Sequence, residues 1–155
     1  MKNILSKLII VTLLFTAGNV LAAGSDAKHY PGVFVGMTSV SSETDLTLGV
    51  EYEYKLDPSL GAGFVVERTP DGHGGDGVDI WIASLYYHPI NEVRLGLGYG
   101  SERIGGYKVK HKDVVRLSAA YEFHVENIGI APTFAVDFID GDEAYVLGVA
   151  FVFPY

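Results

Sequence analysis

The sequence predicts an all-β protein, an eight-stranded antiparallel up-and-down β-barrel. Apolar and polar residues alternate with a period of two in segment after segment, and no convincing helical period appears. Turn residues divide these segments into an even number of strands, joined alternately by short and by more polar connections. The chain has 155 residues, of which 48% are apolar and 12% aromatic, with 19 glycines. This length suits one domain, and the composition suits strands.

The same composition excludes several classes of protein. The chain has no cysteine, so it can form neither a disulfide framework nor a thiolate metal site. Its 19 acidic and 11 basic residues give a net charge of −8, which argues against a nucleic-acid partner. Its apolar fraction is too high for a disordered chain.

The first residues predict a signal peptide. Lys2 and Lys7 make a short basic start, and an apolar run follows at residues 8–15. Small residues then lead to Ala22, where we expect cleavage, with Ala23 as the neighbouring alternative. The other interpretation is a membrane anchor, but the run is shorter than the roughly 18 apolar residues that a spanning helix needs.

Cleavage would leave an exported, acidic domain. We expect residues 1–22 to be the signal peptide, 23–29 a short N-terminal segment and 30–155 the barrel. Removing the two early lysines leaves 9 basic against 19 acidic residues, a net charge of −10.

The first four expected strands are residues 33–38, 44–55, 60–68 and 79–88. The alternation is clearest in the second, where one face carries Leu46, Leu48, Val50, Tyr52 and Tyr54. The first and fourth are apolar on both faces. If Val33, Val35, Trp81 and Leu85 point outward, then Phe34, Ile80 and Ile82 point inward, and the sequence leaves this orientation open.

The last four expected strands are residues 93–102, 113–124, 128–139 and 145–155. One face of the fifth carries Val93, Leu95, Leu97 and Tyr99, and one face of the sixth carries Val115, Leu117, Ala119, Tyr121 and Phe123. The eighth is apolar on both faces, with Val146, Ala150 and Val152 opposite its aromatic row.

The connections predict which end of the barrel is which. Tight turns are expected at 57–59, 89–92 and 125–127, and more polar connections at 41–43, 69–78, 103–112 and 140–143. Both chain ends then lie on the side of the tight turns. Short periplasmic turns and longer outer loops are typical of outer-membrane barrels.

The two faces of the strands predict a transmembrane barrel. One face is bulky and nearly free of charge, whereas the other is small, polar or ionisable, as in the series Arg94, Gly96, Gly98 and Gly100. The interior of an eight-stranded barrel is only wide enough for side chains to fill it. We therefore expect the bulky face to meet lipid, with aromatic residues gathered near both strand ends as two girdles.

The eight expected strands, the signal peptide and the final Phe151-Val152-Phe153-Pro154-Tyr155 resemble small bacterial outer-membrane barrels of the OmpA/OmpX type. The resemblance covers residues 30–155, and no motif selects a subfamily. It implies a Gram-negative-type outer membrane as the location. It also implies that the barrel-assembly machinery reads the aromatic end of the last strand. Here that end is Tyr155 in place of the more usual Phe, with Pro154 before it.

Charged residues on the inner face should pair with one another, because an unpaired charge in the lumen would be costly. We expect an ionic network that plugs the lumen, in which two arginines hold several carboxylates. Its members are Glu51, Glu53, Glu67, Arg94, Arg116, Glu122, His124 and Asp137. The alternative role for these residues is a path for protons or ions.

Catalysis and metal binding have weaker signals. Ser84 and His88 share a face but are about 13 Å apart along a strand, so we expect no catalytic residues, and the enzyme alternative is a lipid A-modifying protein. Residues 74–82 match one copy of a calcium-binding Gly/Asp repeat, and Asp71, His73, Asp76 and Asp79 could add ligands. That repeat works by stacking turns, so we expect no metal and no cofactor.

One outer loop is basic on an otherwise acidic protein. Lys108, Lys110 and Lys112 could contact lipopolysaccharide phosphates, or they could simply be solvated. We therefore expect a monomeric outer-membrane barrel with a filled lumen and a structural or surface-interaction role, whose partners are lipid, lipopolysaccharide and the assembly machinery. The alternatives are the lipid A-modifying enzyme and a soluble periplasmic barrel that binds a small ligand.

Overall fold

The computed structural model describes residues 27–155, so the expected signal peptide lies outside the described residues. The first half of the sheet consists of β1 (His29–Val40), β2 (Glu43–Lys55), β3 (Leu60–Thr69) and β4 (Val78–Ile90), with a single helical turn α2 (Gly72–Gly75) between β3 and β4. The second half consists of β5 (Val93–Ile104), β6 (Lys110–Tyr121), β7 (Phe123–Val125), β8 (Ile128–Ile139) and β9 (Asp142–Val152). In this part of the chain no helix is long and apolar enough to cross a bilayer.

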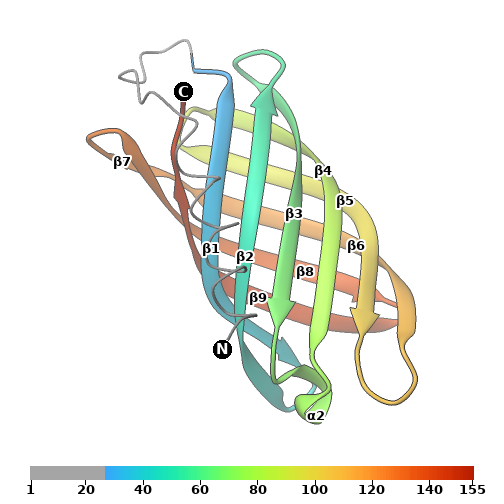
Figure 1. Ribbon diagram of the computed structural model, residues 1–155. Helices are drawn as coiled ribbons and strands as arrows, with labels where there is room; N and C mark the ends of the chain where they lie inside the picture. The colour runs from blue at the N-terminus through green and yellow to red at the C-terminus, as the bar shows by residue number, and fades with distance from the viewer. Residues whose placement is uncertain (1–26) are drawn as a thin grey trace, which may run out of the picture.

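The strands close into a barrel. Each strand from β1 to β5 pairs antiparallel with the next, β6 and β7 both pair with β8, and β9 pairs with β8 and β1. Since β6 and β7 pair with β8 in one continuous register, they count as one barrel strand, interrupted at Glu122. The predicted eight-stranded antiparallel barrel is confirmed (Figure 1).

The interruption at Glu122 is a difference from the unbroken strand expected at 113–124. The Glu122 backbone N–H donates to the carbonyl of Glu92 in the neighbouring turn, at 2.7 Å. Beyond that residue the chain no longer follows β5 and stays paired only with β8, because β5 begins at Val93.

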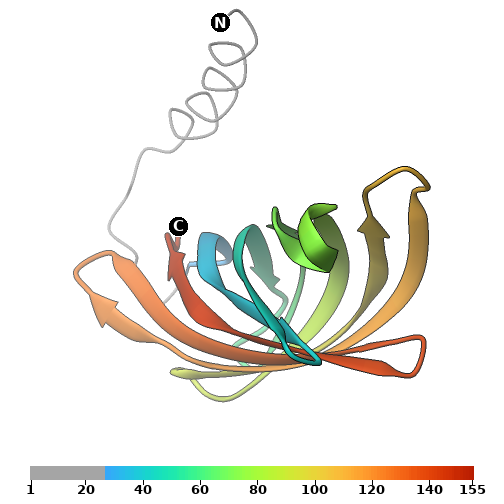
Figure 2. The same ribbon diagram turned by 90° about the horizontal axis from the view of Figure 1, so that it is seen from below.

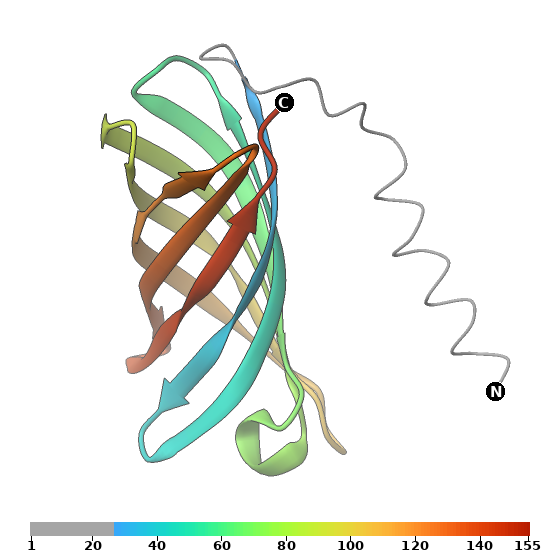
Figure 3. The ribbon, with the colours of Figure 1, turned by 90° about the vertical axis from the view of Figure 1, so that its left-hand side faces the viewer.

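The connections divide the barrel into two ends. The turn end carries the connections at 56–59, 91–92 and 126–127, and the loop end carries those at 41–42, 70–77, 105–109 and 140–141. Figures 1 and 3 show the C-terminus with the tight turns, and α2 at the opposite end. Figure 2 shows α2 and the neighbouring loops from below.

Local chemistry explains the turns. The Asp57 side chain accepts hydrogen bonds from the backbone N–H groups of Ser59 and Leu60, at 2.7 and 3.0 Å. Asp140 and Gly141 both have positive φ, 50° and 91°, which is the conformation of a two-residue hairpin whose twist matches the strands.

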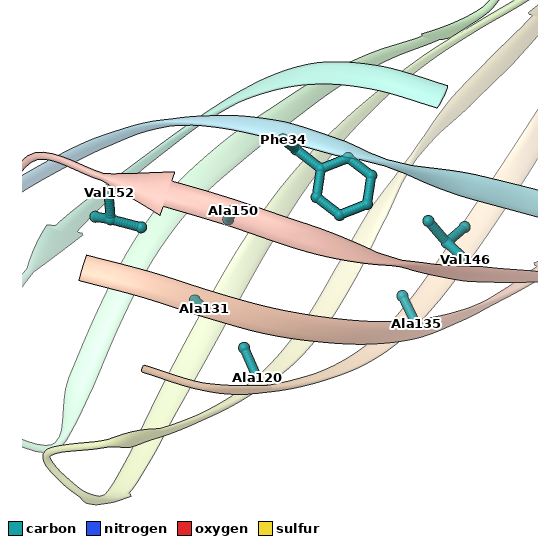
Figure 4. Close-up of a cluster of buried hydrophobic side chains, with 7 residues drawn as sticks. All are labelled: Phe34, Ala120, Ala131, Ala135, Val146, Ala150 and Val152. Atoms are coloured by element: carbon teal, nitrogen blue, oxygen red, sulfur yellow. The ribbon is translucent and has the colours of Figure 1, made fainter. Parts of the chain in front are cut away.

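The orientation that the sequence left open is now settled. Phe34, Ile80 and Ile82 are buried in the interior, whereas Trp81 and Leu85 are exposed on the outer surface. Val146, Ala150 and Val152 of β9 are also buried. Together with small residues of β6 and β8 they form an apolar wall inside the barrel, which consists of Phe34, Ala120, Ala131, Ala135, Val146, Ala150 and Val152 (Figure 4).

Backbone pairing continues past the end of β9. The N–H groups of Phe153 and Tyr155 donate to the carbonyls of Pro31 and His29 at 2.8 and 2.9 Å, and the His29 N–H donates back to Tyr155 at 3.0 Å. Pro154 lies between these two contacts, where alternation turns its missing N–H away from β1. The pairing of β8 with β9 starts only at Gly129 and Val152, so the proline costs no ladder bond there.

Candidate functional site

The interior of the barrel holds two clusters of buried charged residues. The register places Glu51 and Glu53 on the inner face of β2, Glu67 on that of β3 and Asp137 on that of β8. Arg94 of β5 and Arg116 of β6 face them. Each arginine reaches across the lumen to a strand three positions away, because β5 meets β2 and β6 meets β3.

The central cluster consists of Arg116, Glu67 and Asp137. Two guanidinium nitrogens of Arg116 donate to the two carboxylate oxygens of Asp137 at 2.6 and 2.7 Å. Donations to the two oxygens of Glu67 measure 2.9 and 2.7 Å. The planar fork of the arginine therefore holds one carboxylate on each of two sides. One of these carboxylates is its cross-strand neighbour, and the other lies across the barrel.

The turn-end cluster consists of Arg94, Glu51, Glu53, His88 and Tyr86. Arg94 donates to Glu51 at 2.8 Å and, more weakly, to Glu53 at 3.5 Å. His88 Nε2 is 2.6 Å from Glu53 Oε1, so Glu53 is shared between a guanidinium and an imidazole. The Arg94 guanidinium also lies over the Tyr86 ring, 5.0 Å from its centroid.

Glycines make room for these carboxylates on the narrow inner surface. A Cβ added at Gly49 would lie 2.8 Å from Cγ of Glu67, and one added at Gly32 would lie 3.0 Å from Cγ of Glu51. Gly61 faces Glu53 in the same way. The small residues of the inner face therefore leave the volume that the ionic side chains occupy.

Glu122 and His124 are not joined to either cluster. His124 Nε2 lies 2.9 Å from Glu122 Oε1 at the rim of the turn end, and the His124 side chain is 51% exposed. The eight residues expected to form one network therefore lie in three groups: the central cluster, the turn-end cluster without its histidine and tyrosine, and this rim pair.

Sequence reasoning missed three interior residues. His88 and Tyr86 belong to the turn-end cluster, and the Glu102 carboxylate is buried near the loop end. The alternation in β4 would have placed His88 and Tyr86 on the same inner face as Ile82, but that strand is apolar on both faces and its orientation was open. Glu102 continues the inner row of Arg94, Gly96, Gly98 and Gly100, and this alternation was the available signal.

Apolar side chains fill other parts of the interior. The apolar wall of Figure 4 lines the interior along β1, β6, β8 and β9. A second cluster gathers toward the loop end, from Val78, Ile80, Ile82, Ile104, Val114, Ile139 and Ala144. Two cavities lie at the ends of the barrel, one of 560 Å³ at the turn end and one of 330 Å³ at the loop end.

The candidate metal ligands of the loop are not brought together. Asp79 pairs with Arg68 at 2.6 Å and with Arg103 at 3.1 Å, on the outer surface. Asp71 and Asp76 are exposed, and residues 27–155 contain no group of three or more histidine or acidic side chains positioned to hold a metal ion.

The candidate catalytic pair is also separate. Ser84 and His88 are both buried on the inner face of β4, but the hydrogen bond of His88 goes to Glu53. Within the described part of the chain, no serine hydroxyl is bonded to a histidine. The basic loop divides as well, because Lys108 and Lys110 are exposed whereas Lys112 is partly buried beside Glu102 across the β5–β6 pair.

No protein-family model matches this chain, and neither does any curated protein. Solved structures do match it. The Neisserial surface protein A is 13% identical, with a TM-score of 0.59 over 86% of this chain and 100% of that one. The N-terminal barrel domain of OprF from Pseudomonas aeruginosa is 10% identical, with a TM-score of 0.57 over 84% and 100%. Ail, the attachment invasion locus protein of Yersinia pestis, is 13% identical in its complex with sucrose octasulfate, a heparin analogue, with a TM-score of 0.51 over 83% and 97%. At this identity the likeness concerns the fold, which this chain shares with small outer-membrane barrels.

Proposed function

We propose that the chain is an integral outer-membrane barrel, exported through a cleaved signal peptide, whose interior is closed to solutes. Its role is structural or one of surface interaction, and it is neither an open porin nor an enzyme. The observation that carries this proposal is the inversion of the two faces: large apolar side chains are exposed around the outside, and charged ones are buried within.

The outer surface supports placement in a membrane. Leucine, valine and aromatic side chains are exposed along the outward rows of the barrel strands, with Leu97 at 56%, Leu117 at 49% and Leu147 at 64%. A soluble protein rarely exposes a continuous apolar surface of this extent, because water disfavours it. In hydrocarbon the same surface is stabilising, and a closed barrel leaves no unpaired strand edge.

The interior supports a closed lumen. Arg94 and Arg116 each span the space between opposite walls and are held there by buried carboxylates. The apolar wall of Figure 4 fills further interior space along β1, β6, β8 and β9. Single-channel recording of the protein in planar bilayers should therefore show no steady conductance, and a stable open channel would contradict a closed lumen.

Site-directed labelling tests the orientation. Because the chain has no cysteine, single-cysteine variants carry one label each. Labels at Leu95→Cys and Leu117→Cys should report acyl chains, whereas the adjacent, inward-facing Ser118→Cys is the matched control. Fractionation completes the test: recovery in the outer membrane supports the proposal, and recovery in the soluble periplasm would favour a soluble barrel.

A surface interaction at the loop end is supported by the loop at 105–109. Lys108 and Lys110 are exposed next to Tyr107, whose side chain is fully accessible. Lysine ammonium groups bind phosphates and sulfates through charge-assisted hydrogen bonds. The structure of Ail in complex with a heparin analogue is an instance of an anionic ligand on a barrel of this fold. We expect the partner here to be the phosphorylated lipopolysaccharide.

The double variant Lys108→Gln/Lys110→Gln should weaken binding to lipopolysaccharide and reduce its salt dependence. Lys112→Gln is the matched control, because Lys112 is partly buried and should contribute little. An equal loss of lipopolysaccharide binding in the control and in the double variant would contradict this contact. Mass analysis of lipid A from cells with and without the protein tests the enzyme alternative, and we expect no change in acylation.

The aromatic residues Phe151, Phe153 and Tyr155 of the closing strand are the expected signal for the barrel-assembly machinery. Pairing of this segment with β1 closes the sheet, so that within the described barrel no full-length strand is left without a neighbour on either side, which supports a monomer.

A further inference from the structure

The loop end of the barrel contains a cavity of 330 Å³ with an acidic lining, which we call the loop-end vestibule. Its acidic lining residues come from β2, β5 and β9, and the threonine and serine hydroxyls of β1, β3 and the first loop complete its polar surface. The four carboxylates are Glu43, Asp45, Glu102 and Asp142. His73 is the only basic residue among the lining residues, all of which belong to the described part of the chain.

Glu102 is the lining residue whose buried carboxylate is not fully hydrogen-bonded. Its side chain lines the vestibule, yet the residue is only 5% exposed, and Oε1 has no hydrogen-bond partner within residues 27–155. The other buried carboxylates of the lumen, such as Glu67 and Asp137, each accept two hydrogen bonds from an arginine. A buried polar group without a partner is unusual and costly, and it indicates an unfilled place for a donor.

The nearby basic side chains of the described residues do not pair with the Glu102 carboxylate. His73 and Lys112 act electrostatically on Glu102, but neither forms an ion pair with it. Nearby carboxylates of Asp137 and Asp140 add further negative potential. The site therefore favours a positively charged ligand that brings its own N–H donors.

The spacing of the carboxylates discriminates between kinds of cation. A calcium ion requires six to eight oxygen ligands within about 2.3–2.6 Å, and the described residues offer no such cluster. A flexible organic cation instead places separate ammonium groups on separated carboxylates and hydroxyls. The volume of the vestibule lies at the lower end of the usual range for small-molecule sites.

We propose that the loop-end vestibule binds a small organic polycation through its ammonium groups, with the Glu102 carboxylate as the acceptor at its floor. The other acidic residues of the lining bind the remainder of the ligand nearer the mouth. This inference depends on the barrel fold and not on the membrane placement proposed above.

Spermidine is the probe for a calorimetric titration of the detergent-solubilised protein at moderate salt. We expect saturable binding, weakened about tenfold or more by Glu102→Gln, the factor that corresponds to losing one charge-assisted hydrogen bond. Glu102→Gln should fold normally, since it removes an unpaired buried charge, and heat-modifiable migration in gels checks this. Lys112→Gln removes a competing cation and should tighten binding.

Glu122→Gln is the matched control, because the Glu122 carboxylate also lines a cavity, but at the turn end, where it lies beside His124. Unchanged affinity in this variant, together with the loss in Glu102→Gln, supports the site. Equal weakening in both variants would overturn it, because that result indicates attraction to the net charge alone. Unchanged binding in Glu102→Gln, or equal binding of tetramethylammonium, which has no N–H donor, would also overturn it, as would heat from Mg²⁺ with none from spermidine.

Discussion

The two buried ionic clusters both pair arginine with carboxylates inside the barrel, but they differ in how fully the arginine is hydrogen-bonded. In the central cluster Arg116 makes four hydrogen bonds to two carboxylates, all between 2.6 and 2.9 Å. In the turn-end cluster Arg94 makes one bond at 2.8 Å and one at 3.5 Å, and His88 supplies the other donor to Glu53. The comparison teaches that a buried charge is stabilised by its specific partners, and that a shared carboxylate makes a cluster less dependent on any one of them.

The largest effect is expected at the central cluster. Arg116→Ala leaves Glu67 and Asp137 buried without a cation and should destabilise the barrel by about 3–5 kcal/mol, measured by urea unfolding in lipid vesicles. Arg103→Ala, at an exposed ion pair on the outer surface, is the control and should change stability little. Urea resistance equal to that of the unmodified protein would argue against a structural role for the cluster.

The second largest effect is expected for an arginine placed on the outward face of β6, where it has no carboxylate partner. Leu117→Arg places a second arginine next to Arg116, but on the outward face, where hydrocarbon offers no carboxylate. It should cost about 2–4 kcal/mol near the bilayer midplane, by the same unfolding measurement. Leu117→Met keeps an apolar side chain and serves as the control. A stable Leu117→Arg variant would show that this face does not meet lipid.

Arg94→Ala should be milder than Arg116→Ala, at about 2–3 kcal/mol, because His88 still donates to Glu53 and only Glu51 loses its partner. Combining this change with His88→Phe, which has no N–H donor, should cost more than the sum of the two single changes, since Glu53 then loses both the guanidinium and the imidazole donor. Strict additivity in this double-mutant cycle would mean that the two donors do not share Glu53.

The smallest effect is expected between the clusters. Ser118 lies on the inner row of β6, two residues from Arg116, and is paired with Gly96. Within residues 27–155 its hydroxyl makes no hydrogen bond, so Ser118→Ala should change stability by less than about 0.5 kcal/mol. A large loss of stability in this variant would mean that the whole inner row of β6, and not only the two clusters, determines stability.

Much of the fold could be predicted because alternation reports directly which side chains share a face. The strand at 44–55 agrees with β2 to within a residue, and its inner residues Glu51 and Glu53 are buried as alternation requires. The strand at 113–124 was predicted without its interruption, because the contact from Glu122 to Glu92 joins residues 30 positions apart and leaves no local pattern.

The pairing inside the lumen could not be predicted to the same degree. Arg116 meets Glu67 because of how β3 and β6 are staggered around the barrel, and this stagger is set by the closure of the whole sheet. The place of His124 at the exposed rim and that of His88 within a cluster depend on the same geometry. Alternation determines whether a residue faces inward or outward. Which inward residues of opposite strands lie at the same level along the barrel axis depends on how the whole sheet closes.

The seam between β1 and β9 has a consequence for the order of assembly. Its pairs, such as Gly32 with Val152, join residues more than a hundred positions apart, whereas every other neighbouring pair is a local hairpin. The entropic cost of bringing such distant segments together is met only at the final step, so closure should be the slow event. The hairpins can form in any order beforehand, and the curled sheet keeps two unpaired edges until β1 pairs with β9.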